Sequence, residues 1–256
     1  MTHTTLSQIY EPMLLALFGI SALVAIVLMW INAPYGRHLR SGWGPTIPAR
    51  AGWIIMETPA VVAIALMFIW SDRHFDPVSI VFLALWQSHY LYRTYVFPFR
   101  LRAARKPMPI LIILMAITFN CWNGFLNGAW LFHLSPERDI SWWRDLRFIF
   151  GTALFFVGMI INRQSDAILL RLRAPGETGY KIPHGGMYRW ISMPSYFGEL
   201  VQWVGFALAT WSLAGLAFAV FTAANLVPRA VANHRWYRQT FADYPQNRKA
   251  VIPFVL

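Results

Sequence analysis

A carboxyl group and a phenol lie in two neighbouring apolar segments of the sequence. Glu57 is in AGWIIMETPAVV, and Tyr90 is in QSHYLYRTY, which also contains Arg93. An apolar environment disfavours the carboxylate, so the two groups can share a hydrogen bond and polarise a carbonyl oxygen that enters from lipid. We therefore predict a site for a lipid-soluble carbonyl compound. The alternatives are an interfacial Glu57 and a hydrogen bond that serves only helix packing.

The spacing of these two residues indicates that they lie at the same depth. If their segments form an antiparallel hairpin that turns near His74, Glu57 precedes the turn by 17 residues and Tyr90 follows it by 16. His89 and Tyr92 then point to other faces of the helix. We expect His89 and Tyr92 to be packing or interfacial residues.

A second polar region, residues 162–199, interrupts the apolar sequence. Asn162 and Asp166 are one helical turn apart, and Arg171 and Arg173 follow before proline and glycine end the helix. Polar groups suit a ribose and a base, and guanidinium groups suit phosphates, so the region predicts a nucleotide cofactor site. A solvated basic loop is the alternative. The sequence has no Walker loop and no GxGxxG after a strand, so helices would bind the nucleotide.

Composition argues against several other classes of protein and site. The seven histidines show no HxxxH spacing, and Cys121 is the only cysteine, so we predict no metal site. A single cysteine also excludes a disulfide within the chain. The net charge of +11 is explained by basic loops at a membrane surface, so we predict membrane lipids and no nucleic acid as partners.

Membrane-spanning helices must position these residues. The chain is 57% hydrophobic and only 13% charged, where soluble proteins have about a quarter charged residues. Apolar runs occupy about 13–31, 53–70, 77–97, 109–131, 147–161, 197–210 and 213–228. We predict an all-α integral membrane protein with seven transmembrane helices in one domain, residues 1–256. Six crossings are the alternative, because the break at 210–212 is hardly polar.

The distribution of charge predicts the orientation. The segments 34–52 and 98–108 and the tail after residue 228 are rich in arginine and lysine, whereas 72–76 and 137–145 mix acids with bases. Because short basic loops stay on the cytosolic side, we predict an N-terminus outside and a C-terminus in the cytosol.

The fourth apolar run contains a repeat of small and polar residues. Asn123, Gly124, Asn127 and Gly128 follow an i and i+4 spacing. Small residues at this spacing let helices approach closely, so a packing seam is at least as well supported as a ligand contact. Asn127 has the groups for both roles.

The later part of the chain resembles a known family. The segment that begins GETGYKIPHGGMYRW and ends in DYPQNRKAVIPFVL closely resembles the C-terminal half of steroid 5-alpha-reductases, also called 3-oxo-5-alpha-steroid 4-dehydrogenases. The similarity is collinear upstream through NGFLNG, HYLYRTYVFP and the Glu57 region, and ALATWSL and DYPQNRKAVIPF are highly specific. The resemblance implies a seven-span, NADPH-dependent enzyme that reduces the carbon 4 to carbon 5 double bond of a 3-oxo-Δ4-steroid.

The resemblance also implies roles for individual residues. Glu57 and Tyr90 would bind the steroid carbonyl, in a pocket mainly within the first four spans. The NADPH site would lie mainly in residues 162–256. The residues implied in cofactor binding are Trp53, Arg93, Asn162, Asp166, Arg173, Tyr180, Ser195, Glu199, Arg229, Asn233 and Tyr237.

Three departures from the family pattern predict altered cofactor contacts. Ser195 stands where the family often has asparagine, Asn233 replaces a histidine of animal members, and Leu170 replaces a basic residue. We expect the steroid to enter from the lipid bilayer, and we infer no obligate protein partner. The expected location is a bacterial inner membrane, or the endoplasmic reticulum membrane in a eukaryote.

Two other functions remain open from the sequence, and a third, that of a transporter, is disfavoured. A trans-2-enoyl-CoA reductase shares this fold and would turn over an acyl-CoA. A membrane methyltransferase of the isoprenylcysteine type has a similar basic C-terminal region and would bind S-adenosylmethionine. A transporter would use Glu57 for translocation, but the chain lacks an inverted repeat with broken helices.

Overall fold

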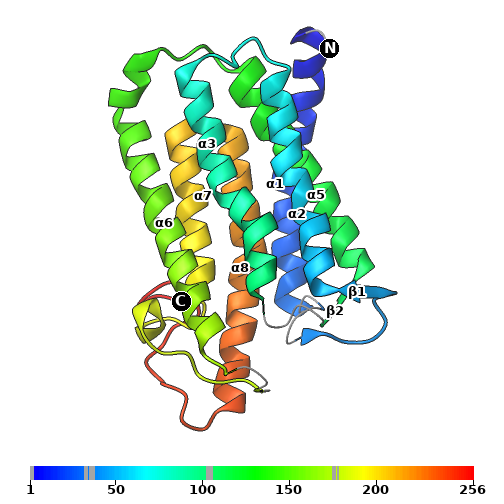
Figure 1. Ribbon diagram of the computed structural model, residues 1–256, viewed down its shortest axis with the longest axis vertical. Helices are drawn as coiled ribbons and strands as arrows, with labels where there is room; N and C mark the ends of the chain where they lie inside the picture. The colour runs from blue at the N-terminus through cyan, green and yellow to red at the C-terminus, as the bar shows by residue number, and fades with distance from the viewer. Residues whose placement is uncertain (1–2, 32–33, 35–37, 102–105, 175–176, 178) are drawn as a thin grey trace.

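The computed structural model describes residues 3–31, 34, 38–101, 106–174, 177 and 179–256, and it is a bundle of roughly parallel long helices (Figure 1). The long helices are α1 (His3–Trp30), α2 (Ala49–Ile69), α3 (Pro77–Leu91), α5 (Ile110–Ala129), α6 (Leu146–Arg171), α7 (Pro194–Thr210) and α8 (Leu213–Thr240). The shorter elements are two antiparallel strands, β1 (Thr46–Pro48) and β2 (Pro107–Pro109), α4 (Phe97–Arg100), π-helical turns at Tyr92–Val96 and Trp130–Leu134, and 3₁₀ turns at Ile140–Arg144 and Gly186–Arg189.

Each predicted apolar run corresponds to one of the long helices. Five described segments are long and apolar enough to cross a membrane: Thr4–Trp30, Ala49–Ile69, Ile110–Leu134, Leu146–Arg171 and Leu213–Thr240. The helices α3 and α7 have only 15 and 17 residues. The prediction of an all-α, multi-pass membrane protein is therefore confirmed, whereas seven crossings and their orientation stay predictions.

The break between the last two helices is a turn despite its weak polarity. Trp211 caps α7 in the left-handed conformation, with φ 45°. Ser212 then caps α8 by accepting a hydrogen bond from the backbone N–H of Gly215. A non-glycine residue at positive φ is uncommon, and here it reverses the chain within two residues.

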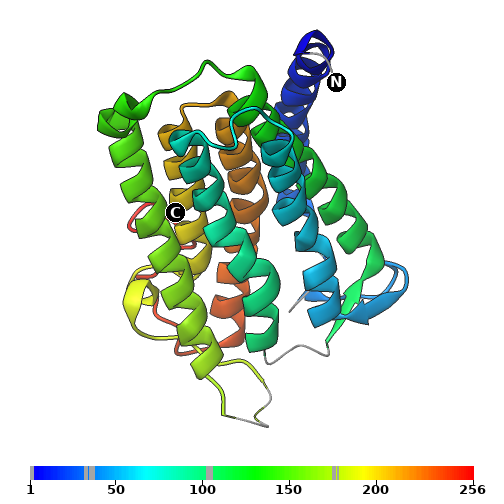
Figure 2. The same cartoon turned by 45° about the horizontal axis from the view of Figure 1, so that its top comes forward.

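The connections between helices gather alternately at the two ends of the bundle (Figures 1 and 2). The N-terminus and the α2–α3, α5–α6 and α7–α8 connections lie at the upper end. The paired strands β1 and β2, the segment between α6 and α7, and the segment after α8 lie at the lower end. This alternation matches the predicted grouping of mixed-charge and basic segments. Parts of the basic segments, residues 35–37 and 102–105, lie outside the described residues.

Glycines fix the contact between α6 and α7. A β-carbon at Gly151 or Gly158 would overlap backbone atoms of α7, and one at Gly198 or Gly205 would overlap backbone atoms of α6. The two helices therefore approach backbone to backbone between Gly151 and Gly158 of α6 and between Gly198 and Gly205 of α7. This four-glycine seam aligns the polar residues near the lower end of α6 with those at the start of α7.

The repeat in α5 is also a packing seam. A β-carbon at Gly124 would lie 2.8 Å from Cβ of Ala63, and one at Gly128 would lie 2.6 Å from Cβ of Met67, both on α2. The Asn127 amide donates to Oδ1 of Asn123 within the same helix, at 2.9 Å. The packing interpretation is confirmed for the two glycines, and a ligand contact by Asn127 stays a prediction.

The segment after α8 folds back against the residues that precede α7. Ile191 and Lys249 form a parallel β-bridge, and the backbone N–H of Met193 donates to the carbonyl of Ala250 at 3.0 Å. The hydroxyl of Ser192 lies 2.6 Å both from Nδ1 of His234 and from the Tyr244 hydroxyl. This clasp holds the first turn of α7 from below.

Candidate active site

The register between α2 and α3 places Glu57 and Tyr90 at the same level. The indole N–H of Trp86 donates to the carbonyl of Ala60, and the Gln87 amide donates to the carbonyl of Val61, both at 2.9 Å. Glu57 precedes Ala60 by three residues on α2, and Tyr90 follows Trp86 by four residues on α3. Because the helices are antiparallel, both steps are about one turn in the same direction, so Glu57 and Tyr90 lie at the same level. The hairpin geometry predicted from the sequence is therefore confirmed.

Aromatic rings hold Tyr90. Its side chain is buried and stacks on Trp86, with ring centroids 4.9 Å apart, and the Trp203 ring lies 5.7 Å away. Within the described residues, no side chain or backbone group forms a hydrogen bond with the Tyr90 hydroxyl. The phenol is thus fixed by its ring and has a hydroxyl that can donate to a ligand.

Glu57 is half-buried and interacts with charged and polar neighbours. Its carboxyl group interacts electrostatically with Arg93, Glu199 and Tyr90. The Asn120 amide, which donates to the carbonyl of Met56 at 2.6 Å, is within reach of the same carboxyl group. Glu57 and Tyr90 therefore belong to one electrostatic unit with Arg93.

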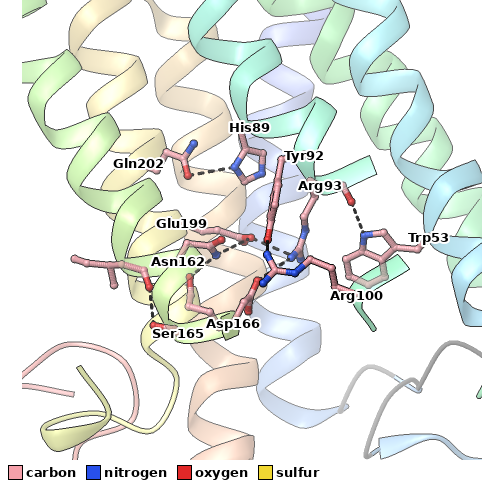
Figure 3. Close-up of polar contacts among 12 residues, drawn as sticks. Trp53, His89, Tyr92, Arg93, Arg100, Asn162, Ser165, Asp166, Glu199 and Gln202 are labelled. Atoms are coloured by element: carbon pink, nitrogen blue, oxygen red, sulfur yellow. Dashed lines mark hydrogen bonds and ion pairs between the residues drawn. The ribbon is translucent and has the colours of Figure 1, made fainter. Parts of the chain in front are cut away.

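Arg93 is the centre of the polar cluster (Figure 3). Its two terminal nitrogens lie 3.8 Å from Oδ2 of Asp166 and 3.7 Å from Oε1 of Glu199. Its guanidinium group lies over the rings of Trp53 and Phe97, 4.6 and 4.7 Å from their centroids. The indole N–H of Trp53 also donates to the Arg93 carbonyl at 3.2 Å.

The acids around Arg93 keep unused acceptor atoms. The Asn162 amide donates to the Ser195 carbonyl at 3.0 Å and to Oε1 of Glu199 at 3.4 Å. Oδ2 of Asp166 is buried and, among the described residues, has no hydrogen-bond partner. A buried oxygen without a donor is costly, so this site suits a ligand that brings hydroxyl groups.

A π-helical turn positions Arg93. Pro98 lacks an N–H group, and the preceding Phe97 N–H donates to the carbonyl of Tyr92, five residues back. Such π turns are frequent at functional sites. Within the same turn, Tyr92 accepts a hydrogen bond from Arg100, and the Arg163 guanidinium lies 4.3 Å from its ring centroid.

Two of the predicted residues of α8, Arg229 and Asn233, form a second group. Arg229 donates to the Tyr196 hydroxyl at 3.0 Å. The Asn233 amide donates to the Arg229 carbonyl at 2.9 Å, and its oxygen lies 3.3 Å from Nε2 of His38. Because Tyr196 also interacts electrostatically with Arg93, it links the two groups.

The remaining predicted cofactor residues lie at the lower end. Tyr180 and Tyr237 both pack edge-on against Trp236, with centroids 4.9 and 5.2 Å away. Arg173 is on the segment after α6 and donates to the Gly179 carbonyl at 3.1 Å. The structure thus brings Trp53, Arg93, Asn162, Asp166, Ser195 and Glu199 together directly, and Arg173, Tyr180 and Tyr237 form a separate group.

One polar pair was missed from the sequence. Nδ1 of His89 lies 3.2 Å from Oε1 of Gln202, and both residues are buried. The His89 ring also contacts the Tyr90 ring edge-on at 5.1 Å. The sequence feature that could have indicated this pair is Gln202, a polar residue inside the apolar run 197–210. Within the described residues, no three His, Cys, Asp or Glu side chains are arranged to hold a metal ion.

The chain matches a described protein family and several curated proteins. The family model for 3-oxo-5-alpha-steroid 4-dehydrogenase matches residues 106–256. Steroid 5-alpha-reductase DET2 from Arabidopsis thaliana is 40% identical over 237 residues, which cover 90% of each chain. The 3-oxo-5-alpha-steroid 4-dehydrogenase 1 from Bos taurus is 43% identical over 235 residues, 90% of this chain and 91% of that protein. Its counterpart from Homo sapiens is 42% identical over 227 residues, 88% and 86% of the two chains.

Proposed function

Because the chain belongs to the 3-oxo-5-alpha-steroid 4-dehydrogenase family, we propose that it reduces the carbon 4 to carbon 5 double bond of 3-oxo-Δ4-steroids with NADPH. The observation that carries this proposal is the level placement of Glu57 and Tyr90 beside the Arg93 cluster. Hydride transfer to a conjugated ketone requires groups that bind the ketone oxygen and, next to them, a polar site that binds the hydride donor.

The residues around Arg93 suit a nicotinamide nucleotide. Asn162, Asp166 and Glu199 offer amide and carboxylate groups for ribose hydroxyls. Oδ2 of Asp166, which has no hydrogen-bond partner among the described residues, supports this assignment. Arg173 and Arg229 would meet the phosphates, because guanidinium groups bind them with charge-assisted hydrogen bonds. When bound, NADPH supplies the hydride.

The chain's own groups then act on the steroid. The Tyr90 hydroxyl donates a hydrogen bond to the 3-oxo oxygen, and Glu57 stabilises the same oxygen as it gains negative charge in the enolate. The rings of Trp86 and Trp203 hold the phenol in place and keep water from it. A solvent proton completes carbon 4.

The surface of the bundle supports entry of the steroid from lipid. Large apolar side chains are exposed along α1 and α2, for example Leu23 and Ile55. A steroid dissolved in the bilayer would reach the Glu57 level without crossing water. We place the protein in a bacterial inner membrane, or in the endoplasmic reticulum membrane if the source is a eukaryote.

The direct test measures NADPH oxidation by the purified protein in detergent. Testosterone, progesterone, a trans-2-enoyl-CoA and no acceptor are compared, each with NADPH and with NADH. We expect turnover only with the two steroids, NADPH to be preferred over NADH, and a 5α-reduced product by mass spectrometry. Turnover of the enoyl-CoA in place of the steroids would assign the other reductase activity to this fold.

A further inference from the structure

The upper end of the bundle, opposite the Arg93 cluster, carries a charged cavity. It has a volume of about 570 Å³, and its walls include Trp130, Arg138, Asp139, Trp142, Arg147 and Trp211. These residues come from the α5–α6 connection, the start of α6 and the α7–α8 turn. None of them takes part in the proposed reduction.

Guanidinium groups and indole rings alternate along the inner wall. Trp142 lies between two arginines, with the Arg138 and Arg147 guanidinium carbons 4.8 and 4.7 Å from its ring centroid. Arg147 also lies 5.0 Å from the Trp211 ring centroid. Arg138 is anchored by a hydrogen bond of 2.9 Å to the Thr210 carbonyl. The wall is therefore built to hold positive charge in a fixed place.

Positive charge is crowded on this wall. Arg73, behind Arg138, donates to the same Ser135 hydroxyl as Arg138, at 3.1 and 3.3 Å. Burial and the like charges of Arg73 and Arg147 lower the pKa of Arg138, and Asp76 acts in the opposite direction. An anion in the cavity would relieve this repulsion.

Negative charge lies at the rim. Glu137 and Asp139 are exposed and line the cavity. Hydrogen bonds from Ser141 lower the pKa of Asp139, so its carboxylate is ionised at neutral pH. Asp145 accepts two hydrogen bonds from the Arg147 side chain, at 2.9 and 2.6 Å, and so neutralises part of the charge of that arginine. The cavity thus has a cationic inner wall and an anionic rim.

Lipid-facing side chains adjoin the cavity. Leu146 and Leu213 are 66% and 59% exposed, and Phe150 one turn further along α6 is 59% exposed. Apolar residues this exposed at the end of a membrane helix contact acyl chains, and tryptophans mark the level of the headgroups. The cavity therefore lies where phospholipid headgroups are found.

We propose that this cavity binds the headgroup of a zwitterionic phospholipid of the phosphoethanolamine class. The phosphate would lie against Arg138 and Arg147, and the primary ammonium group, which extends further toward water, would lie between Glu137 and Asp139. The acyl chains would follow the exposed side chains of Leu146 and Phe150. The two rim acids disfavour an anionic headgroup, which has no cation to meet them.

The test uses the delipidated, full-length protein in detergent. Native mass spectrometry and thermal unfolding report the binding of short-chain phosphatidylethanolamine, phosphatidylglycerol, free phosphoethanolamine and inorganic phosphate. We expect saturable binding and a raised melting temperature with phosphatidylethanolamine, about tenfold tighter than with phosphatidylglycerol. Equal affinity for both lipids, or binding of free phosphate as tight as that of the lipid, would overturn the proposal.

Matched variants assign the site. Arg138→Gln should weaken phosphatidylethanolamine binding about tenfold, because one charge-assisted contact is lost. Glu137→Gln combined with Asp139→Asn should remove the preference over phosphatidylglycerol, and it should leave the fold intact because asparagine also caps a helical turn. Arg144→Gln, an exposed arginine on the same connection, is the control and should change neither value. Unaltered selectivity in the double variant would contradict the proposed role of the rim.

Discussion

The phenol of Tyr90 is oriented by ring contacts, so its hydroxyl can be removed without disturbing the surrounding helices. Its ring stacks on Trp86 and lies edge-on to His89, and both contacts persist when phenylalanine replaces it. Tyr90→Phe therefore tests the hydroxyl group alone, whereas Tyr90→Ala would also remove the packing of the ring.

At the level of single residues, we expect Glu57→Gln and Tyr90→Phe each to reduce steroid turnover about 10²- to 10³-fold, the usual cost of losing one donor at a developing oxyanion. NADPH binding should stay close to wild type, because neither group is assigned to the cofactor phosphates. Turnover, melting temperature and NADPH affinity are measured on the same preparations.

The double variant provides the control for this prediction. Because the two side chains act on one oxygen, Glu57→Gln with Tyr90→Phe should be little slower than the slower single variant. A pair that serves only packing would instead lower the melting temperature and preserve turnover per folded molecule. Normal turnover in a stable Tyr90→Phe enzyme would contradict the assignment of Tyr90 to binding of the steroid carbonyl.

Several contacts of the site could be predicted from single residues, and others could not. Glu57 and Tyr90 were found because a carboxyl group in an apolar helix needs a partner and because their distances from the turn match. The pairing of His89 with Gln202 joins residues 113 positions apart, and nothing in either local sequence indicates the other.

At the level of elements, the four-glycine seam makes α6 and α7 sensitive to the smallest added side chain. A β-carbon at Gly158 would overlap the backbone of Gly198 and Gln202, so Gly158→Ala requires the helices to move apart. We expect a loss of about 1–3 kcal/mol in stability, the usual cost of overpacking, together with weaker NADPH binding. Thermal unfolding and a cofactor titration measure the two effects.

Gly19 of α1 is the matched control for this substitution. An added β-carbon there has no heavy atom within 4 Å, and alanine favours helix over glycine by about 1 kcal/mol. Gly19→Ala should therefore leave stability unchanged or raise it. A Gly158→Ala protein as stable as the Gly19→Ala protein would show that the helices can separate without cost.

The elements themselves were largely predictable, because long apolar runs dictate membrane helices. Their irregularities were not. The π-helical turn at Tyr92–Val96 and the left-handed Trp211 depend on packing around Pro98 and Arg147, and periodicity does not report such contacts. The short pairing of β1 with β2 likewise joins segments about sixty residues apart in sequence.

At the level of the whole molecule, the alternating ends of the bundle predict the side of the membrane on which each connection lies. Asp72 and Asp243 are exposed. Asp72 belongs to the α2–α3 connection at the upper end, and Asp243 belongs to the segment after α8 at the lower end. In a Cys121→Ser background, Asp72→Cys should react with a membrane-impermeant maleimide on intact cells. Asp243→Cys should react only after permeabilisation.

Two other labelling patterns would contradict the predicted topology in different ways. Reaction of Asp243→Cys alone on intact cells would reverse the predicted orientation and keep the alternating arrangement. Reaction of both variants from outside would contradict the arrangement itself. The Cys121→Ser protein without an introduced cysteine, treated with the same maleimide, gives the background signal.

The clasp between residues 191–193 and 249–250 also has a consequence for how the protein is made. Lys249 and Ala250 leave the ribosome after every helix of the bundle, yet their carbonyl groups accept hydrogen bonds from the residues directly before α7. The start of α7, with Ser195 and Glu199, therefore gains this support only after every helix of the bundle has been synthesised. We expect assembly of the cofactor site to be completed only after the helices have been inserted into the membrane.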